Sequence, residues 1–251
     1  MMQENTPETN LLEGKNAVWE ALKAERPIEK ILLSKSINQE SVRGITGLAR
    51  GRNIKIEWAP KEKLDGLSTT GRHQGVLAVC AAHTYADLDE VLDSLKDSAY
   101  PPLIVLLDEI QDPHNLGAII RTAECAGAQA IVIPQHNSAG LTPAAGRASA
   151  GAIEHVPVCR VPNLAAAIER LKERGLWVVG GDMDGKPVYD IDLTGPIALV
   201  IGSEENGIRR LVREKCDHVA SLPMLGKLNS LNASVAAGVL LYEAVRQRGK
   251  R

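Results

Sequence analysis

Polar side chains gather in three clusters, and each cluster directly follows an apolar segment of the chain. The first cluster holds Asn115 and Arg121, the second Glu204, and the third Ser230 and Asn232. Amide, hydroxyl, carboxylate and guanidinium groups can together orient a ligand and stabilise charge that develops during a reaction. In open parallel sheets, ligands bind beyond the carboxyl ends of the strands. We therefore expect the three clusters to form one composite site.

The third cluster lies in residues 222–242, LPMLGKLNSLNASVAAGVLLY. Pro223 and Gly226 predict a turn, and Ser230 is expected to cap a helix. Apolar residues then recur at helical spacing at Leu231, Val235, Ala236, Val239 and Tyr242. The pattern predicts a loop whose backbone groups can contact a ligand, followed by a buried helix. An ordinary strand–turn–helix connection would explain the same segment.

The first and second clusters place charged groups in apolar surroundings. In DPHNLGAIIRTA the Asp-Pro pair predicts a turn, Asn115 can cap a helix, and Arg121 follows two isoleucines. Such an arginine either points into a cleft or an interface, or is simply exposed. In GSEENG, Glu205 suits the first turn of a following helix, whereas Glu204 is expected to orient Arg121 or to close the site.

Strands and helices alternate from residue 103 onward, which predicts an α/β domain with a parallel sheet covered by helices. PLIVLLDEI is a continuous apolar strand of the kind that is buried on both faces. Residues 11–82 form a smaller unit in which helices and strands also alternate. We expect residues 1–10 to be a disordered leader and residues 83–102 to be a linker that bears at most a helix. Residues 103–251 then form the second domain.

Two nucleotide-binding signatures were tested because the fold class invites them. The chain contains no G-x-G-x-x-G. The segment GGDMDGK, residues 180–186, resembles a P-loop in part, but Pro187 stands where a Ser or Thr hydroxyl should reach magnesium. We interpret the segment as a polar turn.

Composition describes an ordinary globular protein, with 44% hydrophobic and 24% charged residues. The four cysteines are far apart and lack metal-ligand spacing, so we expect neither a disulfide framework nor a metal site. No apolar run is long enough to span a bilayer, and the first residues are too polar for a signal peptide. A cytoplasmic protein is expected. Residues 11–80 carry an excess of four basic residues, which permits phosphate contacts without requiring them.

The three clusters together carry a resemblance. NLGAIIRTA, ALVIGSEENG and LPMLGKLNSLNAS, in this order, resemble the three motifs of the SpoU (TrmH-like) family of S-adenosylmethionine-dependent RNA ribose 2′-O-methyltransferases, within the SPOUT superfamily. The N-terminal unit, with LLEGKNAVWEAL and HQGVLA, is similar to the L30e/L7Ae-like RNA-binding extension of the ribosomal-RNA members. With the ending LLYEAVRQR, this pairing is most similar to members that modify a guanosine of large-subunit (23S) rRNA.

The resemblance implies a deep trefoil knot in the C-terminal domain and a homodimer in which the motif-one helix lies near the partner's site. It also implies that S-adenosylmethionine is held mainly by backbone groups. The corresponding positions are Gly202, Leu222, Met224, Gly226 and Leu231. The helix after Leu231 then belongs to the core and to a dimer surface. No metal is needed for the reaction.

The implied reaction requires either removal of the 2′-hydroxyl proton or stabilisation of the developing alkoxide. Arg121 is the family's candidate base, but a guanidinium with a pKa above about 12 rarely gives up its proton. We expect Arg121 to act as an electrostatic clamp while Asn115, Ser230 and Asn232 position the ribose. His114 is the rival base, since an unperturbed histidine has a pKa near ~6.5.

RNA is expected to be held by shape, phosphate contacts and hydrogen bonds, because only 3% of the residues are aromatic. Lys15, Arg72 and His73 are candidates for RNA contact, although each could equally be ordinary surface. Two alternatives stay open: a tRNA-modifying enzyme, and a non-catalytic RNA-binding factor of ribosome assembly.

Overall fold

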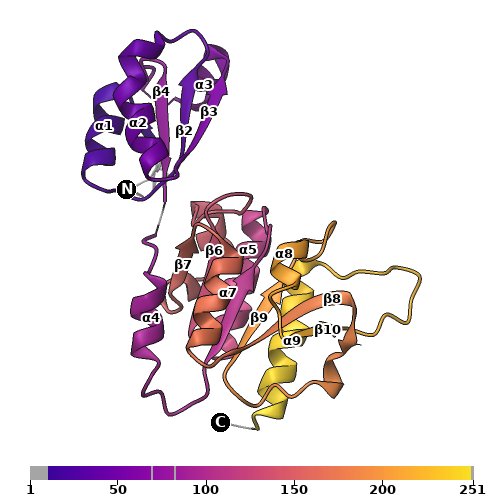
Figure 1. The fold of residues 1–251 in the computed structure, drawn as a ribbon. Helices are drawn as coiled ribbons and strands as arrows, with labels where there is room; N and C mark the ends of the chain where they lie inside the picture. The colour runs from indigo at the N-terminus through magenta and orange to yellow at the C-terminus, as the bar shows by residue number, and fades with distance from the viewer. Residues whose placement is uncertain (1–10, 69, 82, 250–251) are drawn as a thin grey trace, which may run out of the picture. The chain divides into compact units, whose positions relative to one another are not determined.

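The computed structural model describes residues 11–68, 70–81 and 83–249. The predicted leader and the predicted domain end at residue 82 lie outside these ranges. The described chain forms two compact units that divide between Thr84 and Tyr85. Figure 1 shows the helices and strands of both units. Within the described ranges, no helix is long and apolar enough to cross a membrane.

The first unit is a four-stranded sheet with helices on both faces. Its strands are in the order β1-β4-β2-β3, with β2 and β3 parallel and β4 antiparallel to both of its neighbours. Leu32 and Leu77 pack on α3, whereas Ile31 and Ala78 face α1 and α2. The elements are β1 (Leu11–Glu13), α1 (Lys15–Lys23), β2 (Ile28–Ser34), η1 (Gln39–Val42), α2 (Arg43–Gly51), β3 (Lys55–Ala59), α3 (Lys61–Leu67) and β4 (Val76–Cys80).

The second unit is a six-stranded sheet in the order β10-β8-β9-β5-β6-β7, and every pairing in it is parallel. The prediction of a helix-covered parallel sheet is confirmed. The elements are α4 (Leu88–Ser94), β5 (Leu103–Leu107), α5 (Pro113–Cys125), β6 (Ala130–Pro134), α6 (Pro143–Ala148), η2 (Ala152–Glu154), β7 (Val158–Val161), α7 (Leu164–Glu173), β8 (Trp177–Pro187), η3 (Val188–Asp190), β9 (Ile197–Ile201), α8 (Arg210–Arg213), β10 (His218–Ser221) and α9 (Ala233–Gln247).

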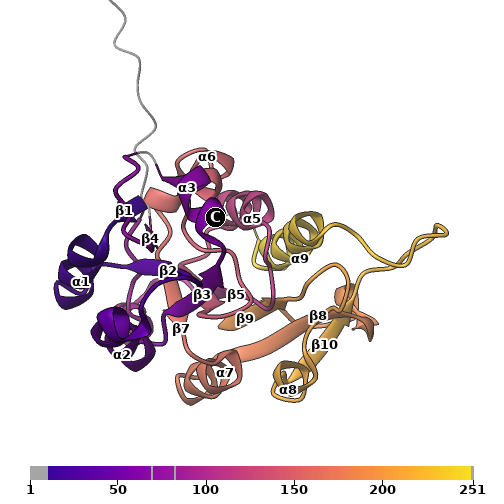
Figure 2. The same ribbon diagram turned by 90° about the horizontal axis from the view of Figure 1, so that it is seen from above.

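Alternate residues of the strands pack into two separate hydrophobic cores, one on each face of the sheet. In β5, Val105 packs with α5 and α9 on one face, and Ile104 packs with α4, α7 and α8 on the other. Figure 2 shows α5 and α9 on one side of the sheet and α7 and α8 on the opposite side. Because successive strand side chains point to opposite faces, a fully apolar strand such as β5 fits a sheet buried on both sides.

The segment predicted as a linker, residues 83–102, contributes to the second unit. It contains α4, whose Leu88 and Leu92 are buried in the core that α7 also covers. Asp87 caps α4 by accepting hydrogen bonds from the backbone N–H groups of Asp89 and Glu90. A helix in this segment agrees with the prediction, but two buried leucines are too few for the sequence to show that the helix packs on the second unit.

Three local predictions differ from the structure. GGDMDGK is not a turn, since β8 continues through it to Pro187. Helix α5 is capped by Asp112 rather than Asn115, with Pro113 at its first position. Helix α9 is capped by Asn232 rather than Ser230. In both helices several polar residues stand near the start, and spacing alone does not select the one whose side chain accepts the backbone hydrogen bonds.

The apolar stripe predicted for the buried face of α9 is largely exposed. Val235 is 51% exposed, Val239 38% and Tyr242 51%, whereas Ala237, Leu240 and Leu241 form the buried face. Helix α9 is apolar on more than one side, so periodicity alone could not tell which side the core covers.

Candidate functional site

Glu204 joins the three polar clusters through hydrogen bonds. Its Oε1 accepts a hydrogen bond from Asn115 Nδ2 at 3.2 Å and another from the backbone N–H of Ala233 at 3.1 Å. Asn232 Nδ2 also donates to this oxygen, and to Asn115 Oδ1 at 3.0 Å. The structure therefore brings one residue from each of the three predicted clusters together. Glu204 orients the two asparagines, and no contact with Arg121 is found among the described residues.

Asn232 has two tasks at the start of α9. Its Oδ1 accepts hydrogen bonds from the backbone N–H groups of Ser234 and Val235, which caps the helix. Its Nδ2 donates to Glu204 and Asn115. The side chain is thus fixed at both ends, so the cap of α9 also sets the geometry of the site.

The turn that carries Glu204 is closed by its own backbone. Ser203 and Gly207 exchange N–H···O bonds of 3.0 and 2.9 Å. A Cβ on Gly202 would stand 2.2 Å from the carbonyl carbon of Gly207, so only glycine fits there. Gly207 itself has φ +63°, a conformation that favours glycine. Glu205 does not belong to the first turn of a helix as expected, because α8 begins only at Arg210.

A buried ion pair fixes the turn to the central strand. Asp108 follows β5 directly, and its carboxylate is fully buried. It accepts hydrogen bonds from the backbone N–H of Arg209 at 2.8 Å and from its Nε at 2.7 Å, and Nη2 lies 2.6 Å away. The contact with Asp108 raises the pKa of the Arg209 guanidinium. Sequence reasoning missed this pair, although an acid at the carboxyl end of an apolar strand was a usable signal.

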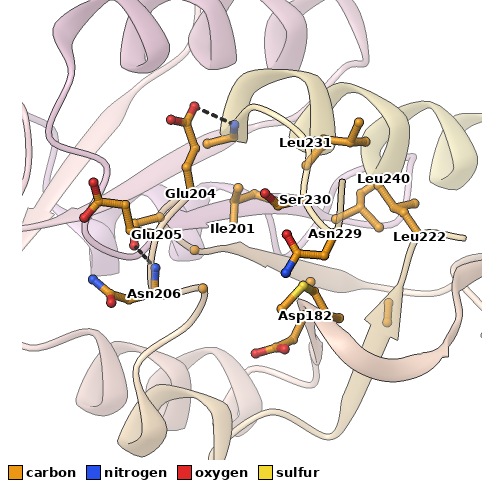
Figure 3. Close-up of a pocket in the computed structure, with 18 of the residues that line it drawn as sticks. Asp182, Ile201, Glu204, Glu205, Asn206, Leu222, Asn229, Ser230, Leu231 and Leu240 are labelled. Carbon is orange, nitrogen blue, oxygen red and sulfur yellow. Dashed lines mark hydrogen bonds between the residues drawn. The ribbon is translucent and has the colours of Figure 1, made fainter. Parts of the chain in front are cut away.

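A cavity of about 260 Å³ lies beyond the carboxyl end of β9, beside the middle of β8, where β8 stops pairing with β9. Figure 3 shows its lining, with Glu204 on one side and Asp182 on the other. Apolar side chains, among them Ile201, Leu222 and Leu240, form part of its wall. The full lining is Gly181, Asp182, Met183, Ile201, Gly202, Ser203, Glu204, Glu205, Asn206, Gly207, Ala220, Leu222, Met224, Asn229, Ser230, Leu231, Ala233, Ala236 and Leu240.

A second cavity of about 280 Å³ meets the first at the Ser203–Asn206 turn and Ala233. Its wall is more polar, and it includes Asn115 from α5. Its lining is Glu109, Ile110, Gln111, Asp112, Asn115, Ser203, Glu204, Glu205, Asn206 and Ala233. Glu204 thus stands between a partly apolar cavity and a polar one.

Most of the predicted cofactor positions line the first cavity, namely Gly202, Leu222, Met224 and Leu231. Ser230 lines it as well. Gly226 is not among the described residues that line it. The sequence analysis did not select Asp182, Asn229 or Leu240, although the strand-end rule that found the other clusters applies equally to the segment after β8's apolar start.

Three predicted residues lie apart from the cavities. Arg121 is exposed on α5, and His114 is exposed at the start of the same helix; neither is among the described residues lining either cavity. His73 is only 3% exposed, with Nε2 2.7 Å from Asp65 Oδ1 and Nδ1 accepting a hydrogen bond from the backbone N–H of Gly75. These contacts make His73 a structural residue of its loop, so it is not available to RNA.

The fold and the site define a class of protein. An open parallel sheet with a partly apolar cavity beyond its strand ends, rimmed by amides and carboxylates, is typical of α/β enzymes that bind a nucleoside-like ligand. Among the described residues, no three His, Cys, Asp or Glu side chains are placed to hold a metal ion.

Comparison with known proteins identifies the family. The model of the "SpoU rRNA Methylase family" matches residues 102–242, and the model "RNA 2'-O ribose methyltransferase substrate binding" matches residues 11–86. The chain belongs to the SpoU rRNA methylase family, a family of S-adenosylmethionine-dependent RNA methyltransferases. The enzyme class and cofactor that the three motifs predict are confirmed at this level.

Relatives match nearly the whole chain. The chain is 48% identical to the "Putative TrmH family tRNA/rRNA methyltransferase YacO" of Bacillus subtilis, over 94% of each chain. It is 44% identical to a protein of the same family name from Staphylococcus haemolyticus, again over 94% of each.

Solved structures give the same result. The SpoU methyltransferase AviRb from Streptomyces viridochromogenes, solved with AdoMet, is 29% identical with a TM-score of 0.60, over 95% of this chain and 90% of that one. The TrmH/SpoU tRNA modifying enzyme of A. aeolicus is 30% identical with a TM-score of 0.55, over 64% of this chain and 84% of that one.

Proposed function

We propose that the protein methylates the ribose 2′-hydroxyl of a guanosine in large-subunit rRNA. The observation that carries this proposal is the meeting of two cavities at Glu204. A group transfer between two bound molecules needs both of them held at a shared boundary, with their reacting atoms aligned. The hydrogen-bonded group of Glu204, Asn115 and Asn232 lies at that boundary.

The first cavity suits the methyl donor by the chemistry of its lining. Leu222, Leu231 and Leu240 offer apolar contact for an adenine ring, and Gly202 belongs to the same lining. Glu204 and Glu205 place negative charge near a ligand that carries positive charge. S-adenosylmethionine, when bound, supplies a methyl group on a positively charged sulfur. Met224 completes the proposed contacts, and Gly226 contributes to them only through the shape of the loop.

The second cavity suits the ribose that accepts the methyl group. Asn115 and Asn232 are held in fixed orientations by Glu204, so their amides can position a hydroxyl group without first being ordered. Ser230 lies on the first cavity's rim and adds a hydroxyl. We propose that these three residues position the ribose and that Arg121 stabilises the developing alkoxide or a neighbouring phosphate.

Arg121 is not among the described residues that line either cavity of its own chain, so we propose that it reaches this site from a second copy of the chain. It lies on the exposed side of α5, next to which α9 presents the exposed side chains of Val235, Val239 and Tyr242. An apolar surface of this kind favours an interface. We therefore propose a homodimer formed by α5 and α9, in which Arg121 of each copy completes the other copy's site.

The first unit would bind the RNA, in line with the substrate-binding model that matches it. Lys15 and Arg72 are exposed or partly exposed there and remain the proposed contacts. We propose an L30e-like fold for this unit. We also propose that the second unit is threaded as a trefoil knot, as the resemblance of its three motifs implies; the return of the chain from edge strand β10 to place α9 beside α5 is the segment in which such a threading would occur.

The test of function is a methyl-transfer assay in a reducing buffer, with transcripts of large-subunit rRNA and of tRNA as substrates. We expect 2′-O-methylation of one guanosine in the rRNA. Methylation of tRNA alone would replace this proposal with the tRNA alternative, which the names of the relatives also allow. Binding of rRNA without methyl transfer would favour the assembly-factor alternative.

The test of the shared site is complementation between inactive variants. Arg121→Ala and Glu204→Ala should each lose activity by at least about 100-fold, the usual cost of removing a group that stabilises a transition state. If Arg121 acts across the interface, mixing the two variants restores activity, because one of the two sites in a mixed dimer is intact. No recovery after mixing, with mixed dimers present, would place Arg121 and Glu204 in the same chain's site. If Arg121→Ala were as active as the wild type, Arg121 would have no catalytic role.

A further inference from the structure

Asp182 is a carboxylate of the first cavity that the proposed reaction does not use. It lies in β8 directly after Gly181 and lines the cavity on the side opposite Glu204 (Figure 3). Its side chain is 16% exposed, so most of it is removed from solvent. A buried charge of this kind needs partners, because desolvation is costly.

The contacts that Asp182 makes within the chain are long. Its Oδ2 lies 3.7 Å from Arg213 Nε, and its Oδ1 accepts a hydrogen bond from the backbone N–H of Asp184 at 3.5 Å. Strong charge-assisted hydrogen bonds are about 2.7–2.9 Å long. A carboxylate offers about four acceptor positions. Asp182 therefore retains acceptor capacity on the cavity side.

The rest of the described lining supplies no cationic partner for this carboxylate. No Lys, Arg or His is found among the described residues of the lining. Glu204, by contrast, accepts three hydrogen bonds from the protein. The group that best satisfies Asp182 is therefore a donor on the bound ligand.

The position of Asp182 selects which donor this is. Gly181 packs so closely on Leu240 that an added Cβ would stand 2.8 Å from Leu240 Cδ1, and Gly181 pairs in register with Ile201. Asp182 is thus one residue away from the apolar wall, where an adenine ring would pack. In S-adenosylmethionine the ribose is bonded directly to the adenine, whereas the amino group lies beyond the sulfur. The sulfur, in turn, must face the acceptor at the Glu204 side.

We propose that Asp182 accepts hydrogen bonds from the 2′- and 3′-hydroxyls of the cofactor's adenosine ribose. This inference rests on the proposed function of the first cavity. Asp182 then anchors the adenosine half of the cofactor, while the opposite side of the cavity faces the acceptor. A carboxylate that accepts from two adjacent hydroxyls discriminates strongly against ligands that lack them, because its buried charge is then left unpaired.

The test is calorimetric binding of two ligands that carry the same ribose. S-adenosylhomocysteine contains the amino-acid part, and 5′-methylthioadenosine lacks it. Neither has a positively charged sulfur, so loss of a carboxylate does not act simply through attraction of the sulfonium. We expect Asp182→Asn to weaken both ligands by about 10-fold or more, the range for a hydrogen bond to a charged group. The matched control Asp184→Asn, an exposed acid two residues further along β8, should bind both as the wild type does.

A change on the ligand keeps the test independent of folding. The wild type should bind the 2′,3′-dideoxy analogue of 5′-methylthioadenosine about 10-fold or more weakly than the parent, and Asp182→Asn should bind the two alike, because the pair is already broken. Arg213→Gln should stay within about threefold of the wild type.

Four outcomes would overturn the inference. The first is unchanged affinity of Asp182→Asn for both ligands, and the second is full affinity of the wild type for the dideoxy analogue. The third is weaker binding of S-adenosylhomocysteine alone, which would assign the carboxylate to the ligand's amino group. The fourth is an equal loss of affinity in Arg213→Gln, which would assign the effect to the ion pair. If the wild type bound neither ligand, the proposed function of the cavity would itself be wrong.

Discussion

The ion pair between Asp108 and Arg209 should respond unequally to loss of its two members. Asp108 is fully buried, whereas the Arg209 side chain is 42% exposed. Arg209→Ala leaves a buried carboxylate with only the backbone N–H of residue 209 as its partner in this pair. Breaking a buried pair in this way lowers the free energy of unfolding by about 3–5 kcal/mol. Because water reaches the Arg209 side of the pair, we expect a loss near ~3 kcal/mol.

Asp108→Asn should cost less, because Arg209 is the partner that is then left unpaired. The guanidinium can turn into water, and the amide oxygen can still accept one hydrogen bond, so the expected loss is about 1–2 kcal/mol. For a unit of this size each kcal/mol lowers the melting temperature by about 2–4 °C. Arg209→Ala should therefore melt several degrees below Asp108→Asn.

The measurements are urea unfolding and thermal unfolding of the two variants, both followed by circular dichroism. Arg210→Ala is the matched control, because Arg210 is the neighbouring arginine, but its side chain is 88% exposed and its ion pair is with Glu214 on the surface. We expect no measurable change in that variant. Equal losses in Arg209→Ala and Asp108→Asn would refute the reasoning, since the cost would then not depend on which charge is left buried.

Three further predictions concern packing, the site and pH. Gly117→Ala should lower the free energy of unfolding by about 1–3 kcal/mol, because the added Cβ would stand 2.5 Å from Ala145 O. In the control Gly47→Ala nothing lies within 4 Å of the added Cβ, so the same urea assay should show unchanged or higher stability. Asn232→Asp keeps the oxygen that caps α9 but replaces the amide that donates to Glu204 by a carboxylate oxygen that repels it, so methyl transfer should fall and the melting temperature should fall with it. The hydrogen bond from Arg246 holds the pKa of Glu243 below its usual value of about 4.3, so its stabilising contribution is present at neutral pH and is lost as pH falls through that lowered pKa. Melting curves from pH 7 to 3 should show a smaller loss of stability in Glu243→Gln than in the wild type, because only the other carboxylates with lowered pKa values still titrate there.

The sequence was sufficient to predict the sheet and the joining of the clusters. A strand such as β5, apolar at every position, is stable only between two layers, which requires a parallel sheet with helices on both faces. Parallel strands end at one edge, so the polar residues after β5, β9 and β10 had to come close together. Asn115, Glu204 and Asn232 are hydrogen bonded as that argument predicts.

Other features depend on tertiary contacts that periodicity does not encode. Val235 and Val239 follow a helical period, but the sequence does not say whether the core or another molecule covers them. Arg121 has the same difficulty, because an arginine beside isoleucines fits a cleft of its own chain as well as that of a partner. His73 was predicted at the surface, yet its hydrogen bonds to Asp65 and Gly75 bury it.

The long segment between β10 and α9 gains its meaning from the strand order. β10 is the edge strand, and β8 separates it from β9, so the chain must cross about 10 Å of sheet to reach the face that α9 shares with α5. The eleven positions of residues 222–232 can span roughly 35 Å when extended, several times what this crossing requires. The excess forms the loop that Figure 1 shows extending from the sheet, with Leu225 99% and Leu228 80% exposed. Leu222 and Met224 at one end and Ser230 and Leu231 at the other nevertheless line the cavity. Residues 222–232 therefore contact the cavity near both ends and are exposed in the middle, and the hydrogen bonds of Asn232 to Glu204 and to the start of α9 fix the end that enters the helix.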